Sequence, residues 1–189
     1  MKSKIIFVIY FLACVSCISK TKEEIYQKNA DEFLSQFFLN FDTDYCVVPP
    51  HKTNLIDYKK GYISQLDSLD LKKEIMSSLG IDDENKMDNQ LELSESFLFN
   101  NQVLNQNTKI INRAAFDNSE KELGYWDNMS HFLETKCSQG LIIISKPLFN
   151  QNYTKAIFYT ETIGGGSIIE FKLENGKWKK IKSILNWIS

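Results

Sequence analysis

The chain has 189 residues, of which 22 are Lys or Arg, 24 are Asp or Glu, and 13% are aromatic. This mildly acidic balance argues against a general role in binding nucleic acid. The length suits one ordinary domain with a sizeable hydrophobic core.

The start of the chain has the pattern of an export signal. Lys2 and Lys4 give a basic beginning, an apolar run covers residues 5–12, and Cys14 and Cys17 follow among small residues. The run is shorter than the roughly 20 residues that a membrane-spanning helix needs. Its length and its basic start are typical of the apolar region of a signal peptide. We therefore expect export from a bacterial cytoplasm.

The segment around these cysteines resembles the lipobox of bacterial lipoproteins, in which a cysteine after small residues is acylated and becomes the new N-terminus. Residues 11–14 and 14–17 both match loosely, and neither has the usual Leu three positions before the cysteine. We expect acylation at Cys17, because it leaves a more ordinary signal length and Ser16 suits the cleavage position. Cys14 is the alternative site. An ordinary cleaved signal with incidental cysteines is the other interpretation.

This interpretation divides the chain into a signal peptide (residues 1–16), a lipid-anchored tether (17–22) and one folded domain (23–189). Loss of Lys2 and Lys4 from the 22 basic residues leaves 20 against 24 acidic ones. The expected location is the cell envelope, facing the periplasm or the cell surface, with the membrane contacted through the lipid.

Two further cysteines, Cys46 and Cys137, lie in the folded part. Thiols of exported proteins tend to pair, because the compartment is oxidising. Their spacing fits no zinc motif. A disulfide between them and two separate buried thiols are both open interpretations.

The first half of the domain is predicted to be helical. Apolar residues recur at helical spacing from Thr21, and Thr21 with Glu24 resembles a capping box. After the break at residues 49–50, a second helical pattern runs over residues 55–79, and Gly80 is a plausible end. The first stripe consists of Ile25, Phe33, Leu34, Phe37, Phe38 and Phe41.

The middle of the chain is harder to assign. The acidic residues from Asp82 to Asp88 lack the spacing of a calcium-binding loop, so we expect a solvated loop. Residues 91–116 show no settled period. Residues 124–133 indicate a helix with an aromatic face.

The last fifty residues predict an antiparallel sheet of about four strands. Asn175-Gly176 between two alternating runs is a strong signal for a hairpin with a type I′ turn. Helices followed by hairpins indicate an α+β domain, with N-terminal amphipathic helices packed on the C-terminal sheet. The predicted strands are 141–145, 155–162, 167–173 and 177–184.

The C-terminal third resembles a family of uncharacterised lipoproteins of the Bacteroidota. The residues that carry the resemblance span about 124–189 and include Trp126, Ser145-Lys146-Pro147-Leu148-Phe149-Asn150, Lys155-Ala156-Ile157-Phe158-Tyr159, the glycine run, Asn175-Gly176-Lys177-Trp178 and Asn186-Trp187-Ile188-Ser189. Many relatives carry cysteines around the glycine run, and this chain has none there. The resemblance implies a fold and an envelope location, and no activity.

No motif predicts a catalytic, metal or cofactor site. Gly164-Gly165-Gly166 is followed by a strand pattern, so we interpret it as a hairpin bend and not as a phosphate loop. Ser130 and His131 are adjacent and would point to different faces of a helix. His131 with Glu134 lacks the spacing of a zinc motif. Trp178 and Trp187 could stack on sugars, but such residues more often fill a core.

Two hypotheses about function follow. The first is a non-enzymatic binding or structural module, with a protein or small-ligand partner in the groove between the sheet and the first helix. The second is an envelope hydrolase with dispersed catalytic residues, which would need a pocket of converging ionisable groups.

Overall fold

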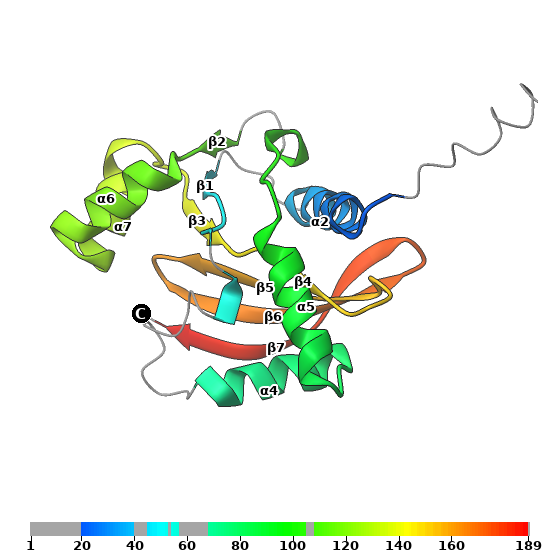
Figure 1. Cartoon of the computed structure of the whole chain (residues 1–189). Helices are drawn as coiled ribbons and strands as arrows, with labels where there is room; N and C mark the ends of the chain where they lie inside the picture. The colour runs from blue at the N-terminus through cyan, green and yellow to red at the C-terminus, as the bar shows by residue number, and fades with distance from the viewer. Residues whose placement is uncertain (1–19, 40–44, 53, 57–67, 105–107, 189) are drawn as a thin grey trace, which may run out of the picture.

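The computed structural model describes residues 20–39, 45–52, 54–56, 68–104 and 108–188. Within these ranges five α-helices, a short 3-10 helix and a mixed sheet of seven strands form an α+β fold, as predicted (Figure 1). The helices are α2 (Lys22–Phe38), α4 (Ser68–Leu79), α5 (Glu84–Glu95), η1 (Asn101–Val103), α6 (Arg113–Leu123) and α7 (Tyr125–Thr135). The strands are β1 (Cys46–Val48), β2 (Lys109–Ile110), β3 (Leu141–Ile144), β4 (Leu148–Phe149), β5 (Lys155–Thr162), β6 (Gly165–Glu174) and β7 (Lys177–Ile188).

The sheet is larger than the sequence predicts. Its order is β2-β1-β3-β5-β6-β7, and β4 pairs with β5. β1 is parallel to both β2 and β3, while β3, β5, β6 and β7 follow one another antiparallel. The four predicted strands are β3, β5, β6 and β7, and they pair antiparallel as expected. The strands that the sequence did not predict are β1, β2 and β4, which have only three, two and two residues. Strands this short show no alternating pattern in the sequence.

The β6–β7 hairpin confirms the predicted turn. Asn175 and Gly176 have φ angles of 52° and 74°. A type I′ turn needs positive φ at both central residues, and Asn and Gly adopt this conformation at low cost. Both strands are longer than predicted, and Glu174 pairs with Lys177 across the turn.

Helices cover both faces of the sheet. Ile142, Ile144 and Phe158 point into the core beneath α2. The neighbouring residues on β3, such as Ile143, pack with α6 and α7, and those on β5, such as Ile157, pack with α4. Alternate residues of a strand point to opposite faces, so α2 lies on one face while α4, α6 and α7 lie on the other (Figure 1).

α2 begins as predicted. The Thr21 hydroxyl accepts a hydrogen bond from the Glu24 backbone N–H at 3.2 Å, and the Thr21 N–H donates to the Glu24 carboxylate at 3.0 Å. The expected apolar stripe is partly wrong, because Ile25 is exposed and Tyr26 is buried in its place. Phe41 lies outside the described residues. α2 begins at Lys22, directly after its cap Thr21.

The segment after α4 differs from the sequence interpretation. Gly80 has a φ of 69° and ends α4, as expected. The acidic residues that follow do not form a loop throughout, because the Asp83 side chain accepts from the Asn85 N–H at 2.8 Å and caps α5. Asp88 therefore lies on a helix, where its carboxylate is paired with Lys72 at 2.8 Å.

Candidate functional site

The groove that the sequence suggested for a ligand, between α2 and the sheet, is filled by aromatic side chains. Phe33 of α2 is fully buried. Its ring meets those of Phe158, Phe171 and Trp178 edge to face, with centroids 5.1, 5.2 and 5.3 Å apart. Such pairs contribute about 0.5–1.5 kcal/mol each beyond the area that they bury. Trp178 is only partly buried, so it closes the edge of this core.

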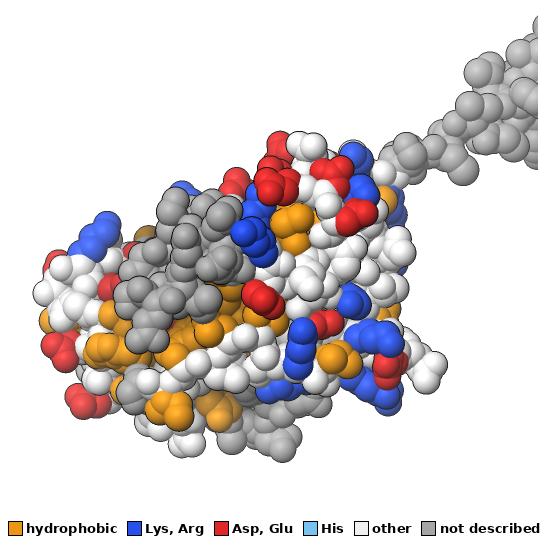
Figure 2. All heavy atoms as spheres, turned by 90° about the horizontal axis from the view of Figure 1, so that it is seen from below, with side chains coloured by type: hydrophobic (Ala, Val, Ile, Leu, Met, Phe, Trp, Pro, Cys, Tyr) orange, Lys and Arg blue, Asp and Glu red, His pale blue; other side chains and the backbone are white. Residues whose placement is uncertain are grey.

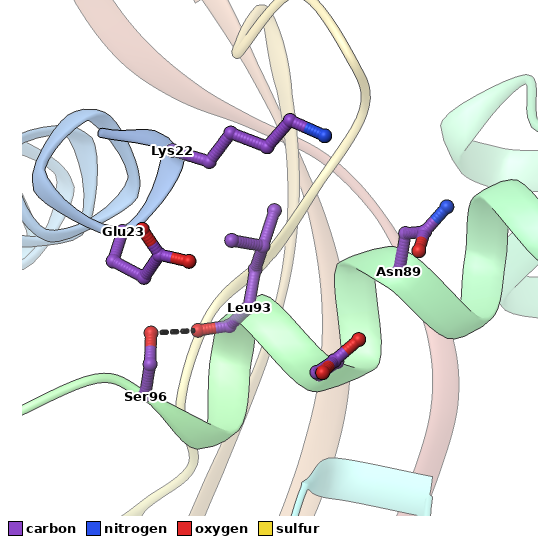
Figure 3. A pocket seen from close by; sticks show the side chains of 6 residues that line it. Lys22, Glu23, Asn89, Leu93 and Ser96 are labelled. Atoms are coloured by element: carbon purple, nitrogen blue, oxygen red, sulfur yellow. Dashed lines mark hydrogen bonds between the residues drawn. The ribbon is translucent and has the colours of Figure 1, made fainter. Parts of the chain in front are cut away.

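A hollow of about 300 Å³ lies elsewhere, between the first turn of α2 and α5 (Figure 3). Its floor is fixed, because Asn89, Leu93 and Ser96 belong to α5 and its C-terminus, and the Ser96 hydroxyl donates to the Leu93 carbonyl at 2.7 Å. The lining residues are Lys22, Glu23, Asn89, Glu92, Leu93 and Ser96.

The lining of this pocket combines both charges with a small apolar surface. Lys22 and Glu23 of α2 face the pocket (Figure 3). The carboxylate residue Glu92 of α5 also lines it. A backbone hydrogen bond at the start of α2, followed by the Thr21 hydroxyl, lowers the pKa of Glu23 and keeps it ionised. The Ser96 hydroxyl is engaged with a backbone carbonyl. This arrangement suits a small group that carries both a positive and a negative charge.

Lys146 is the most unusual cation among the described residues. It is 5% exposed, and its ammonium donates to the carbonyls of Lys52 at 2.7 Å and Glu95 at 2.9 Å. Burial lowers the pKa of Lys146, and the nearby Glu95 opposes this shift. Glu95 is the last residue of α5, where the helix dipole also favours a cation. Lys146 thus ties the end of α5 to the segment that follows β1.

The neighbouring Ser145 could suggest a Ser–Lys catalytic pair. Its hydroxyl accepts from the Tyr159 N–H at 3.0 Å and donates to the Lys146 carbonyl at 3.0 Å. Both Ser145 and Lys146 are buried and hydrogen-bonded to the backbone. These hydrogen bonds therefore indicate a structural role for both residues, which brace the corner between β3 and β4.

The two histidines lie on different elements. His131 is an exposed residue of α7, and Ser130 beside it is half-buried. His51 follows β1 and is half-buried; burial lowers its pKa, and Arg113 lowers it further. Arg113 is itself bound to Asp117 at 2.8 Å. In the described ranges no group of three His, Cys, Asp or Glu side chains is placed to hold a metal ion.

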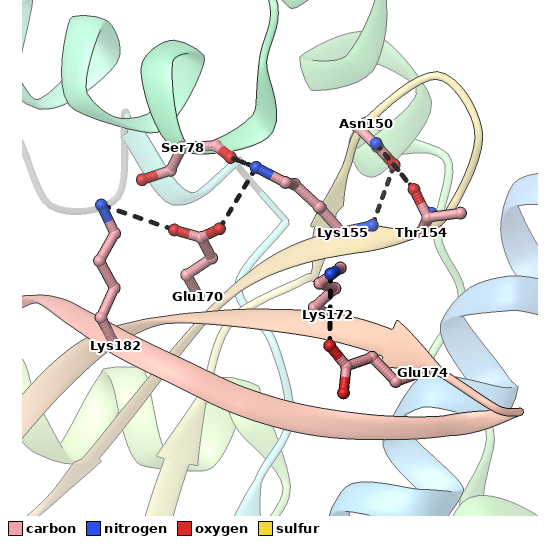
Figure 4. A network of polar contacts seen from close by, with 8 residues as sticks. All are labelled: Ser78, Asn150, Thr154, Lys155, Glu170, Lys172, Glu174 and Lys182. Carbon is pink, nitrogen blue, oxygen red and sulfur yellow. Dashed lines mark hydrogen bonds and ion pairs between the residues drawn. The ribbon is translucent and has the colours of Figure 1, made fainter.

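A buried carboxylate links the sheet to α4 (Figure 4). The Glu170 side chain is 7% exposed and lies 3.5 Å from the Lys155 ammonium and 3.6 Å from that of Lys182. Lys155 also donates to the Ser78 carbonyl at 2.6 Å, near the end of α4. Glu174, at the end of the same strand, pairs with two lysines at the surface. The network is a bridge between strands and a helix.

Cys46 and Cys137 form a disulfide, with Cα atoms 5.6 Å apart. It joins β1 to the segment after α7. Cys14 and Cys17 lie outside the described residues. Among the helices that the structure describes, none combines the length and the hydropathy required to cross a bilayer.

No protein-family model, curated protein or solved structure matches this chain. The site residues are therefore assigned from geometry alone. The sequence did not indicate the pocket between α2 and α5, because its residues come from two segments about 70 positions apart. Lys146 and Glu170 were also missed, since nothing around a lone Lys or Glu in a strand pattern indicates burial.

Proposed function

We propose that this chain is a lipid-anchored protein of the bacterial cell envelope whose folded domain binds a ligand or partner and does not catalyse a reaction. The lipid would be attached to Cys17, with Cys14 as the alternative. The resemblance of the C-terminal third to lipoproteins of the Bacteroidota agrees with this location.

The proposal rests mainly on the short separation in sequence between Cys17, the expected acylated residue, and the start of helix α2. Thr21, which caps α2, follows Cys17 by four positions. Four extended residues span about 14 Å at most. A domain with this short connection would stay at the surface of the membrane that holds the lipid.

The disulfide supports the proposed location in an oxidising compartment outside the cytosol. Disulfides persist in oxidising environments such as the periplasm and the cell surface, and are rare in the cytosol. Cys46 and Cys137 are both buried, at 0% and 2% exposure. A bond in this position acts as a structural brace and is protected from exchange.

The residues that fill the interface between α2 and the sheet, and those that line the α2–α5 pocket, favour a binding function over hydrolysis. The α2–sheet interface is packed with aromatic rings, and the α2–α5 pocket carries fixed charges of both signs. A hydrolase would need a nucleophile and a base that converge in a pocket. Among the residues that the structure describes, Ser145 and Lys146 are adjacent and could suggest such a pair, but both are bonded to backbone groups.

The anchor is tested by fractionating cells that express Cys17→Ser, Cys14→Ser or the unchanged protein. The Cys17→Ser protein should leave the membrane fraction, while the Cys14→Ser protein should stay. Mass spectrometry of the N-terminal peptide should find a diacylglyceryl group on Cys17. Release by Cys14→Ser alone would move the site to Cys14, and retention of both variants would refute the lipoprotein proposal.

A further inference from the structure

Leu98 has an exposed side chain, while its backbone N–H and its backbone carbonyl are both hydrogen-bonded. Its side chain is 76% exposed, whereas the neighbouring Phe97 is buried and stands edge to face with Tyr26. The Leu98 N–H donates to the Gln27 side-chain oxygen at 3.0 Å, and the Gln27 amide donates back to the Leu98 carbonyl at 2.8 Å. These contacts hold the leucine outward, so its exposure is built into the fold.

A single exposed leucine is ordinary in itself, and its position gives it meaning here. Gln27, which holds Leu98, is six positions after the cap Thr21, or about 9 Å along the axis of α2. Thr21 in turn follows Cys17 by four residues, about 14 Å when extended. A lipid on Cys17 would therefore keep the bilayer surface within reach of Leu98.

The charged pocket belongs to the same end of the molecule. Ser96, at its edge, precedes Leu98 by two residues, and Lys22 and Glu23 form the first turn of α2. Figure 2 shows acidic and basic side chains intermixed where α2 begins. Mixed charge gives little attraction to an anionic membrane but matches a headgroup that carries both a phosphate and an ammonium group.

We propose that the occupant of this surface is the bilayer that carries the lipid anchor. Leu98 enters the headgroup region, where exposed apolar side chains gain from burial. The α2–α5 pocket receives a zwitterionic phospholipid headgroup, with Lys22 toward the phosphate and Glu23 and Glu92 toward the ammonium. This inference rests on the proposed anchoring, and it assigns the ligand of the pocket.

The test uses tryptophan as a depth probe in the acylated full-length protein, reconstituted into vesicles of phosphatidylethanolamine and phosphatidylcholine with brominated acyl chains. Leu98→Trp places the probe at the proposed contact. Leu39→Trp is the matched control, because Leu39 is 72% exposed at the other end of α2, about 18 Å along the helix axis from Gln27, which holds Leu98. The three native tryptophans contribute equally to both variants.

Bromine should quench the added fluorescence of the Leu98→Trp variant strongly and that of the Leu39→Trp variant weakly, and high salt should not change this. Equal quenching of the two probes overturns the proposed orientation. So does absence of quenching in protein that floats with the vesicles and carries the acyl mass on its N-terminal peptide. Protein that neither floats nor carries that mass refutes the anchor and this inference together, so the two failures are distinguishable.

Discussion

Cys137, two residues beyond the end of α7, is bonded to Cys46, the first residue of β1, although 91 positions separate them in the chain. Cys46 lies between β2 and β3 in the sheet, and Cys137 ends the helical pair that covers this region. The bond therefore holds α6 and α7 against the part of the sheet with the shortest strands.

Removal of this bond should lower the free energy of unfolding by about 4–5 kcal/mol, because closing a loop of this length restricts the unfolded chain. Urea unfolding of Cys46→Ala/Cys137→Ala should show this loss and should not respond to reductant. The unchanged protein should lose stability when reductant is added. Two free thiols in protein purified without reductant would contradict the bond.

Glu170 and Glu174 offer a matched pair of carboxylates on one strand. Glu170→Gln should lower the free energy of unfolding by about 1–2 kcal/mol, because it leaves Lys155 and Lys182 without the buried charge between them. This loss is smaller than the loss expected for a fully buried ion pair, because both lysines reach solvent. Glu174→Gln should cost less than about 0.5 kcal/mol, as exposed pairs usually do. Urea unfolding of both variants provides the comparison, and equal losses would show that burial of Glu170 has no special role.

Gly166 lies directly beneath the ring of Trp187. A Cβ at this position would stand 2.3 Å from the Trp187 Cζ2 atom. The ring cannot easily move, because it stacks on Tyr159 at 5.5 Å and donates from its Nε1 to Glu161 at 3.4 Å. Gly166→Ala should therefore cost about 1–3 kcal/mol, the usual range for overpacking.

The control for this overpacking is Gly164→Ala, whose Cβ would meet nothing closer than the Thr162 hydroxyl at 3.9 Å. Its stability should change by less than about 0.5 kcal/mol. Thermal unfolding would measure both variants. A neutral Gly166→Ala would mean that the Trp187 ring can leave this position without loss.

His51 should make stability depend on pH below neutrality. Burial, and then Arg113, lowers its pKa below 6.5 in the folded state. Between that lowered pKa and 6.5 the unfolded chain binds more protons, so the free energy of unfolding rises with pH through this window and falls on acidification. His51→Gln should remove this part of the slope.

The pKa itself can be measured by NMR, since the chain has only two histidines. In a His131→Gln variant the single remaining imidazole signal belongs to His51 and should titrate below 6.5. Titration at or above that value would contradict the burial of His51.

The regular elements were predictable where local chemistry dominates. The Thr21 capping box and the Asn175-Gly176 turn depend on residues three or fewer positions apart, and both were recognised. β1 was not, because three residues acquire strand geometry only through partners near positions 109 and 141. Ile25 was assigned to the core by spacing alone, whereas Tyr26 took the buried place by donating its hydroxyl to the Pro147 carbonyl.

The candidate site depended still more on distant contacts. Nothing near Leu98 in the sequence indicates that Gln27 binds it, and an apolar residue between two phenylalanines suggests burial. The pocket requires α2 and α5 to meet, which only packing decides. Lys146 shows the same difficulty, because two carbonyls from separate segments enclose its ammonium.

The long strand β7 has a consequence for crowding. Among the described strands it bonds to β6 along one side, and Lys177, Lys179, Lys180 and Lys182 are all exposed along its first half. At high protein concentration an open strand edge invites pairing between copies. Desolvating four ammonium groups opposes such pairing. The lysines would thus keep neighbouring molecules from joining their sheets into aggregates at high protein concentration.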